Sequence, residues 1–309
     1  MFSPTLAIAQ LAPNEIENLE FLVTFGTESQ TSWGDDDFIQ VFFFSIPETY
    51  NQPFYFRIFD PDTGGKWDEL KGIANTVVKY TVYGGAGVFS EPDARDNKVK
   101  KNYNSGTLLW TRTFDHSAQY DDQWYTIGPF NKLQGEHMTQ EKAYYFKIIA
   151  EGVSGDDGNL YKYALSLSPD ENIAIPGANA FTYSYTFRLP DDPAKVSHIY
   201  PFISNNVIAI NIHNFDFDKG GKMLLYSTSK NRHVIKSSGD NEWQISHHKI
   251  DPDELNSSID IQIVNSGLKN NNMVIYITNE YNQAIPFYTI PIGGPPKYKY
   301  KAIITYPEE

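Results

Sequence analysis

Aromatic and polar residues alternate along this chain, and the alternation restricts what the chain can fold into. In the clearest stretch every second residue is aromatic, at Phe181, Tyr183, Tyr185 and Phe187. A period of two with one apolar face is typical of a strand in an antiparallel sheet whose other face is solvated. No stretch has the 3.6-residue period of a three-turn amphipathic helix, so the sequence predicts an all-β fold.

The predicted strands fall into two series. Eight segments rich in aromatic and β-branched residues come first, at 38–46, 53–59, 76–83, 106–114, 123–130, 142–151, 159–168 and 180–189. Seven shorter segments rich in Ile and Asn follow, at 206–212, 222–228, 242–247, 258–264, 273–278, 285–290 and 298–306. The Pro- and Asp-rich segment 189–195 separates the two series, because strands and helices rarely continue through such residues. We therefore predict two β-sandwich domains, a jelly-roll-like domain over 15–190 and an immunoglobulin- or fibronectin-like domain over 196–309.

The charge of the chain narrows the class of partner. The 309 residues include 38 Asp and Glu against 25 Lys and Arg, which gives a net charge of −13. Nucleic acid and anionic lipid repel such an acidic chain. No apolar run approaches the ~20 residues that a membrane helix needs. We therefore expect neither nucleic-acid binding nor membrane insertion.

The first ten residues bear on where the protein works. Residues 1–10 read MFSPTLAIAQ, in which the small-x-small pattern Ala7-Ile8-Ala9 precedes Gln10. This pattern is typical of the end of a secretory signal peptide, and the alternative is a disordered apolar leader. The absence of cysteine excludes disulfides, thiol nucleophiles and Cys-ligated zinc. We expect an exported protein that is periplasmic, attached to the cell surface or secreted.

A D-x-D turn directly after a predicted strand is the clearest candidate for chemistry. Asp60 and Asp62 are followed by two glycines and then by Asp68. Calcium prefers six to eight oxygen ligands, and such a loop can direct carboxylates and carbonyls toward one point. The alternative is a polar turn whose Asp side chains accept backbone N–H groups.

A second acidic turn contains Asp156, Asp157 and Asn159, and a third lies at residues 34–37. Loops far apart in the sequence can meet at one end of a sandwich. Carboxylates that converge there raise each other's pKa unless they share a cation. We predict that Asp60 and Asp157 lie at a common rim, where they either share Ca²⁺ or remain solvated apart.

The GDDGNLY turn in residues 151–169 and the earlier FDPDTGG turn resemble the bacterial pre-peptidase C-terminal type of β-sandwich. The resemblance covers residues 38–189. It implies an exported, non-catalytic module that binds calcium or matrix and carbohydrate polymers. Carried over by position, it implies a metal near Asp60, Asp62, Asp156, Asp157 and Asn159. The chain departs from that family by lacking an attached protease domain and by its long segment 84–103.

Aromatic residues form a second candidate surface. Trp110, Trp124 and Tyr125 lie on or beside predicted strands, and exposed aromatic rings can stack on sugar rings. The alternative is that these rings belong to the core.

The sequence has no H-E-x-x-H pattern and no G-x-S-x-G pattern, so it predicts no catalytic residue. We therefore expect a non-catalytic, calcium-stabilised protein for adhesion, scaffolding or ligand presentation. Its partner would be an extracellular protein or a polysaccharide. The alternatives are a carbohydrate-binding accessory protein and a glycoside hydrolase that uses two carboxylates.

Overall fold

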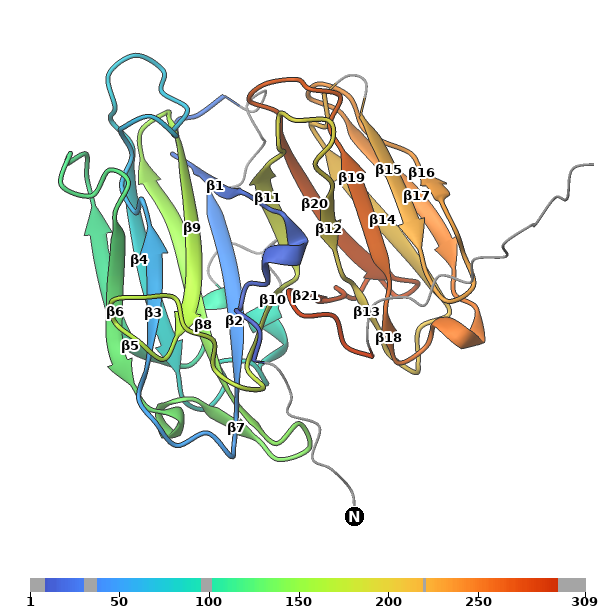
Figure 1. Cartoon of the computed structure of the whole chain (residues 1–309), viewed down its shortest axis with the longest axis horizontal. Coiled ribbons are helices and arrows are strands. Elements are labelled where there is room, and N and C mark those ends of the chain that lie inside the picture. The colour runs from blue at the N-terminus through green and yellow to red at the C-terminus, as the bar shows by residue number, and fades with distance from the viewer. Residues whose placement is uncertain (1–8, 31–37, 96–101, 219–220, 294–309) are drawn as a thin grey trace, which may run out of the picture.

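The computed structural model describes residues 9–30, 38–95, 102–218 and 221–293, and it confirms an all-β sandwich fold (Figure 1). Strands account for 46% of the described structure and helices for 5%, and the described strand pairings are antiparallel. Three predictions concern residues outside the described ranges: the leader at 1–8, the acidic turn at 34–37 and the last strand at 298–306.

Eight strands of the N-terminal half form two facing sheets. One sheet has the order β1 (Phe21–Phe25), β9 (Gly158–Ser166), β3 (Phe54–Phe59) and β6 (Trp124–Phe130). The other has the order β2 (Ile39–Pro47), β8 (Ala143–Ser154), β4 (Val77–Gly84) and β5 (Thr107–Phe114). Among these eight strands, only β4 and β5 are consecutive partners within one sheet. This order is that of a jelly roll, as predicted.

The C-terminal half repeats the same order. Its first sheet has the order β11 (Ser184–Arg188), β20 (Asn272–Asn279), β14 (Ala209–Phe215) and β17 (Trp243–Lys249). Its second has the order β12 (Ser197–Ile199), β19 (Asp260–Val264), β15 (Lys222–Tyr226) and β16 (His233–Ile235). This is again a jelly-roll order, and it differs from the immunoglobulin-like order that we expected. The number and length of strands suit both types of sandwich, and only the long-range pairing distinguishes them.

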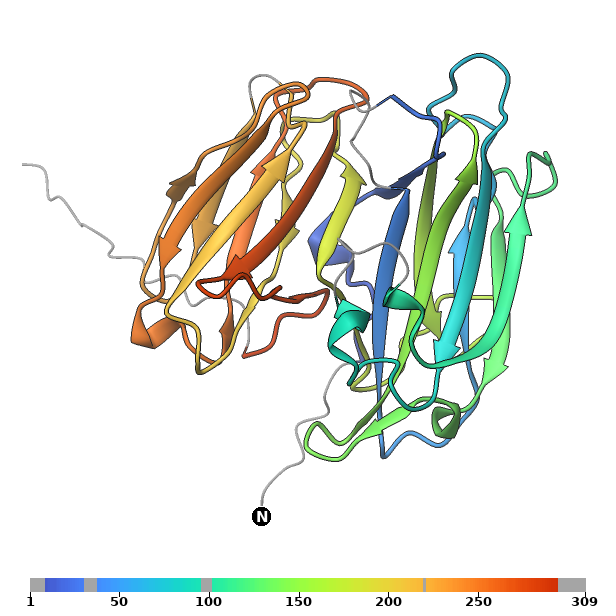
Figure 2. The same cartoon turned by 180° about the vertical axis from the view of Figure 1, so that it is seen from behind.

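The two jelly rolls share one eight-stranded sheet. Strand β1 pairs with β11, with Leu22 opposite Phe187, and this pairing joins the first sheets of the two halves (Figure 2). A single cluster of buried side chains contains residues from both halves, including Phe42, Tyr185 and Ile275. The division into two separate domains at residues 190–195 stays a prediction.

Smaller elements complete the fold. The remaining strands are β7 (Glu136–Met138), β10 (Asn179–Thr182), β13 (Phe202–Ile203), β18 (Ser257–Ser258) and β21 (Phe287–Tyr288). The 3-10 helices are η1 (Glu15–Glu17), η3 (Pro92–Arg95), η4 (Asn102–Asn104), η5 (Lys132–Gln134) and η6 (Pro252–Glu254). In the described ranges, no helix has the length and apolar character to cross a membrane.

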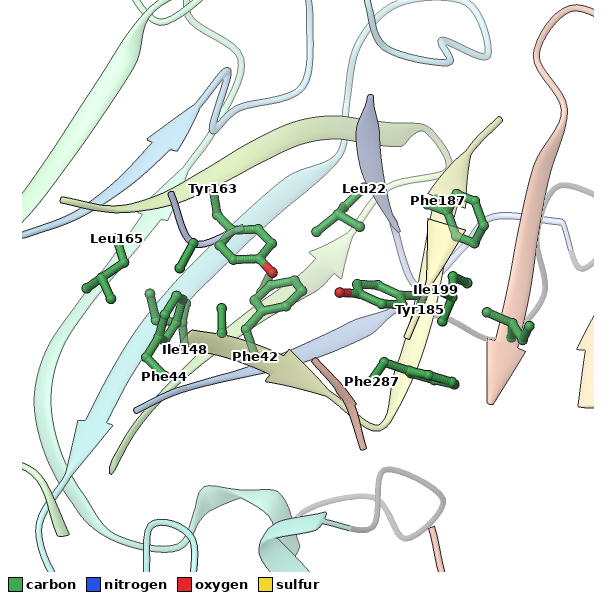
Figure 3. Packing of buried hydrophobic residues seen from close by; sticks show 14 of the residues in the cluster. Leu22, Phe42, Phe44, Ile148, Tyr163, Leu165, Tyr185, Phe187, Ile199 and Phe287 are labelled. Carbon is green, nitrogen blue, oxygen red and sulfur yellow. The ribbon is translucent and has the colours of Figure 1, made fainter. Parts of the chain in front are cut away.

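Aromatic side chains pack between the facing sheets near the β1–β11 pairing that joins the two jelly rolls. Phe42 stacks on Tyr163 with ring centroids 4.7 Å apart, and Tyr185 stacks on Phe287 at 5.7 Å (Figure 3). All four residues are almost completely buried. Burial of a side chain of this size contributes about 1.5–3 kcal/mol to folding.

Candidate cation site

Three loops meet at one end of the first jelly roll because their strands pair antiparallel. Strand β3 ends at Phe59 opposite Trp124, where β6 begins, and β9 begins nearby at Gly158. Glu69, in the loop after β3, forms two backbone hydrogen bonds with Gly158, at 3.0 and 2.9 Å. Asp60 and Asp157 therefore lie at the same end of the sandwich.

A cluster of carboxylates lies where the loop after β3 contacts the loop after β5. One oxygen each of Asp60, Asp62 and Asp121 lie within 4.8 Å of one another. Asp60 and Asp62 are completely buried, and Asp121 is partly buried. Asp121 lies outside the set of ligands that the sequence predicted.

Most oxygens of this cluster have no hydrogen-bond donor. Both Asp60 oxygens and the Oδ1 atoms of Asp62 and Asp121 are buried without a partner. In the neighbouring residues of the two strands and loops, Thr63 Oγ1 and Asn159 Oδ1 are also buried and unpartnered. Buried polar atoms in folded proteins are almost always hydrogen-bonded, so the unpartnered carboxylate oxygens are free to accept an electrophilic partner.

Asn159 and Asp68 border the cluster through β9. Asn159 donates its Nδ2 to the Tyr80 hydroxyl at 3.0 Å, which leaves Oδ1 as the free end of the amide. Asp68 accepts the N–H groups of Gly64 and Leu160, each at 2.6 Å. Asp68 therefore positions the loop after β3 against β9, and its hydrogen bonds occupy both carboxylate oxygens.

Burial dominates the electrostatics of the cluster. Burial, reinforced by the charge of Asp62, raises the pKa of Asp60 to about 7. Burial also raises the pKa of Asp62, and it raises the pKa of Asp68 to about 8. Without a cation, these carboxyls resist ionisation at neutral pH because their charges are desolvated and repel one another.

The donor set fits calcium. The three converging carboxylates offer hard oxygens, which are the ligands that Ca²⁺ takes. Mg²⁺ retains several of its waters, which the completely buried Asp60 and Asp62 do not favour.

Backbone contacts hold the loop after β3 against the loop after β5. Asp60 N–H donates to the Gln123 carbonyl at 2.9 Å, and Ser117 N–H donates to Asp62 Oδ2 at 2.6 Å. A side chain at Gly64 would place its Cβ 2.3 Å from His116 Nδ1, so only glycine permits this approach. The glycines of the FDPDTGG turn therefore bring the loops together.

The other predicted metal ligands have a different environment. Asp157 accepts three backbone N–H groups, from Lys71 at 2.7 Å, Asn75 at 2.8 Å and Thr76 at 3.2 Å. Asp156 accepts Asn75 Nδ2 at 2.9 Å and lies 3.8 Å from the Lys71 ammonium. The structure does not bring these two carboxylates into the cluster, because they organise the neighbouring loop at residues 71–76.

The three predicted aromatic residues do not form one strip. Trp110 and Tyr125 are half-buried with ring centroids 6.1 Å apart, and both pack against the core. Trp124 points to the opposite side of β6 from Tyr125, as adjacent strand residues do. The Arg57 guanidinium lies over the Trp124 ring, 5.0 Å from the ring centroid.

An internal repeat reveals acidic residues that our sequence analysis missed. The pattern F-D-x-D-x-G-G-K occurs at 59–66 and again at 215–222, and D-[DN]-[QE]-W occurs at 121–124 and at 240–243. The structure places both copies equivalently, since Phe59 pairs with Trp124 and Phe215 pairs with Trp243. The second copy forms its own acidic cluster, Asp216, Asp218 and Asp240.

The two copies share the backbone conformation of their first Asp, but their carboxylates differ in hydrogen bonding and exposure. Asp60 and Asp216 both have a left-handed backbone, with φ of 55° and 56°. Asp216 accepts the Asn241 N–H at 2.8 Å, and burial raises its pKa to about 6. Asp240 is exposed. A search for internal repeats would have found Asp121 and the second cluster from the sequence alone.

Comparison with known proteins adds no relative: no protein-family model matches this chain, and no curated protein matches it.

Proposed function

We propose that this protein is an exported, non-catalytic binding or scaffolding protein whose first jelly roll is locked by Ca²⁺ at Asp60, Asp62 and Asp121. The observation that carries the proposal is the convergence of three carboxylates, four of whose oxygens are buried without hydrogen-bond partners. A divalent cation satisfies such oxygens and permits all three carboxylates to ionise.

The cation would act through the loops at the end of the sandwich. The loop after β3 and the loop after β5 each supply a carboxylate to the cluster, so one ion ties them together. Loops at the end of a rigid sandwich are where such folds present binding residues. A locked rim suits a protein that presents a surface to an extracellular protein or a polysaccharide. The resemblance to pre-peptidase C-terminal modules supports the same role.

Thermal unfolding in CaCl₂ and in EGTA tests the proposal. Calcium at a hundredfold excess over Kd stabilises the folded state by about 2.7 kcal/mol, so we expect a clear rise in Tm. The variant Asp60→Asn with Asp62→Asn should remove that rise, whereas Mg²⁺ should raise the Tm of the unmodified protein less.

Asp156→Asn is the matched control, because it removes one acidic charge at the same end of the sandwich without altering the cluster. It should retain the calcium response. An identical melting curve in CaCl₂ and EGTA, together with no heat of calcium binding by calorimetry, would exclude the proposal.

A further inference from the structure

A second candidate site lies beside the β1–β11 pairing that joins the two jelly rolls, where the segment before β1 leaves the sheet. Strand β1 pairs with β9 only from Leu22 onward, and the preceding chain returns to β9 at an isolated bridge between Ala12 and Leu165. Helix η1 lies in the segment between Ala12 and Leu22, beside the β1–β11 pairing (Figure 1). The segment encloses a pocket of about 350 Å³, which is within the range of small-molecule sites.

The floor of the pocket contains a buried acid and phenols. Glu17 is 2% exposed and accepts the Tyr185 hydroxyl at 3.2 Å. The Tyr163 hydroxyl is also buried, and Figure 3 shows the Tyr163 and Tyr185 oxygens directed toward one another. Burial raises the pKa of Glu17 to about 8, so at pH 7 this carboxyl is mostly neutral and can donate a hydrogen bond.

The charges around the pocket balance. Glu15 and Glu20 line it together with Lys162 and Lys195. Apart from the buried Glu17, two acids and two lysines line the pocket, so neither sign of charge dominates it. A pocket of this kind favours a neutral ligand with many hydrogen-bonding groups over an anion or a cation.

Trp124 supplies a flat apolar wall. Its ring is half-buried and lines the pocket, while the Arg57 guanidinium lies over the ring at 5.0 Å. Leu11, Pro13 and Leu19 add further apolar surface. Sugars are neutral ligands that have both an apolar C–H face and a hydroxyl edge, and their C–H faces pack on aromatic rings.

We propose that this pocket binds a neutral sugar residue, with Trp124 against the C–H face and Lys162 and Glu17 bonding to hydroxyls. The inference specifies the ligand class for the proposed binding role, but it does not depend on the cation. The pocket and the acidic cluster share no residue.

Saccharide titration of the full chain, followed by tryptophan fluorescence and calorimetry, tests the pocket. The probes are neutral hexoses, N-acetylhexosamines and their disaccharides, with glucuronate and glucosamine as charged counterparts. We expect at least one neutral probe to bind and the charged counterparts to bind less tightly. Binding should remain in EGTA under conditions where the protein is folded, which separates this test from that of the cation.

Three variants locate the binding. Trp124→Ala should weaken it at least about tenfold, which corresponds to the loss of one aromatic contact. Trp243→Ala is the matched control, because Trp243 occupies the equivalent position on β17 and lies outside the pocket. Glu17→Gln keeps a neutral hydrogen-bonding group and should retain binding. The proposal is overturned if no neutral probe binds, if charged probes bind more tightly, or if Trp243→Ala removes binding and Trp124→Ala does not.

Discussion

Asp60→Asn separates the electrostatic penalty of the acidic cluster from its cation affinity. The substitution keeps the shape of the side chain and removes a buried carboxyl that has no hydrogen-bond partner. In the folded protein the pKa of this carboxyl is raised from 3.8 to about 7 by burial and by the charge of Asp62. The cation-free folded state therefore binds a proton that the unfolded chain has already released.

The sign of the pH dependence follows from this difference. Between about pH 4 and pH 7 the folded state holds more protons than the unfolded state, so the free energy of unfolding falls as pH rises. Each pH unit corresponds to about 1.4 kcal/mol, which gives an upper bound of about 4 kcal/mol for Asp60. Screening by nearby solvent reduces the expected effect to roughly 2 kcal/mol.

Urea unfolding at pH 5 and pH 8 measures this effect. In EGTA, the unmodified protein should lose roughly 2 kcal/mol more than Asp60→Asn between the two pH values, and at pH 8 the variant should be the more stable of the two. In CaCl₂ the order should reverse at pH 8, because the bound ion favours the ionised carboxyl. Equal pH dependence of the two proteins in EGTA would refute the reasoning.

Two further substitutions test structural roles that the contacts imply. Asp157→Ala leaves the Lys71, Asn75 and Thr76 N–H groups without their acceptor, so it should lower the free energy of unfolding by about 1–3 kcal/mol in urea while calcium affinity persists. A loss of calcium binding with unchanged stability would contradict that assignment. Glu254→Gln removes the charged acceptor that faces the buried His248 Nε2, 3.1 Å from Glu254 Oε1, and should cost about 1–3 kcal/mol by the same assay. A variant as stable as the unmodified protein would show that this pair does not stabilise the second jelly roll.

The local elements were predictable because they depend on local sequence. The period of two at Phe181 to Phe187 predicted one strand over 180–189, and the structure divides it into β10 and β11. The first jelly roll and the position of the D-x-D turn at a strand end were also predictable. The strand order of the second half was not, because pairings such as β11 with β20 join residues nearly 90 positions apart.

The composition of the cluster was harder to predict than its position. Asp60 and Asp62 are adjacent in the turn, but Asp121 joins them only through the contact of two loops. Asp157 looked equivalent to Asp60 in sequence, yet three backbone donors occupy it. Whether an acidic turn binds its own backbone or a cation depends on which N–H groups the fold leaves nearby. The residues of the turn alone do not determine which N–H groups those are.

The two copies of the internal repeat leave their carboxylates in different surroundings. In the second copy Asp216 accepts a backbone N–H and Asp240 is exposed, so hydrogen bonding and water can satisfy the carboxylates. In the first copy both Asp60 oxygens are buried without a donor. Since turn geometry is shared, the difference lies in how the surrounding loops cover the carboxylates. The cation requirement that we propose is therefore a consequence of burial in the first jelly roll, and Asp60 is the residue at which it should be measured.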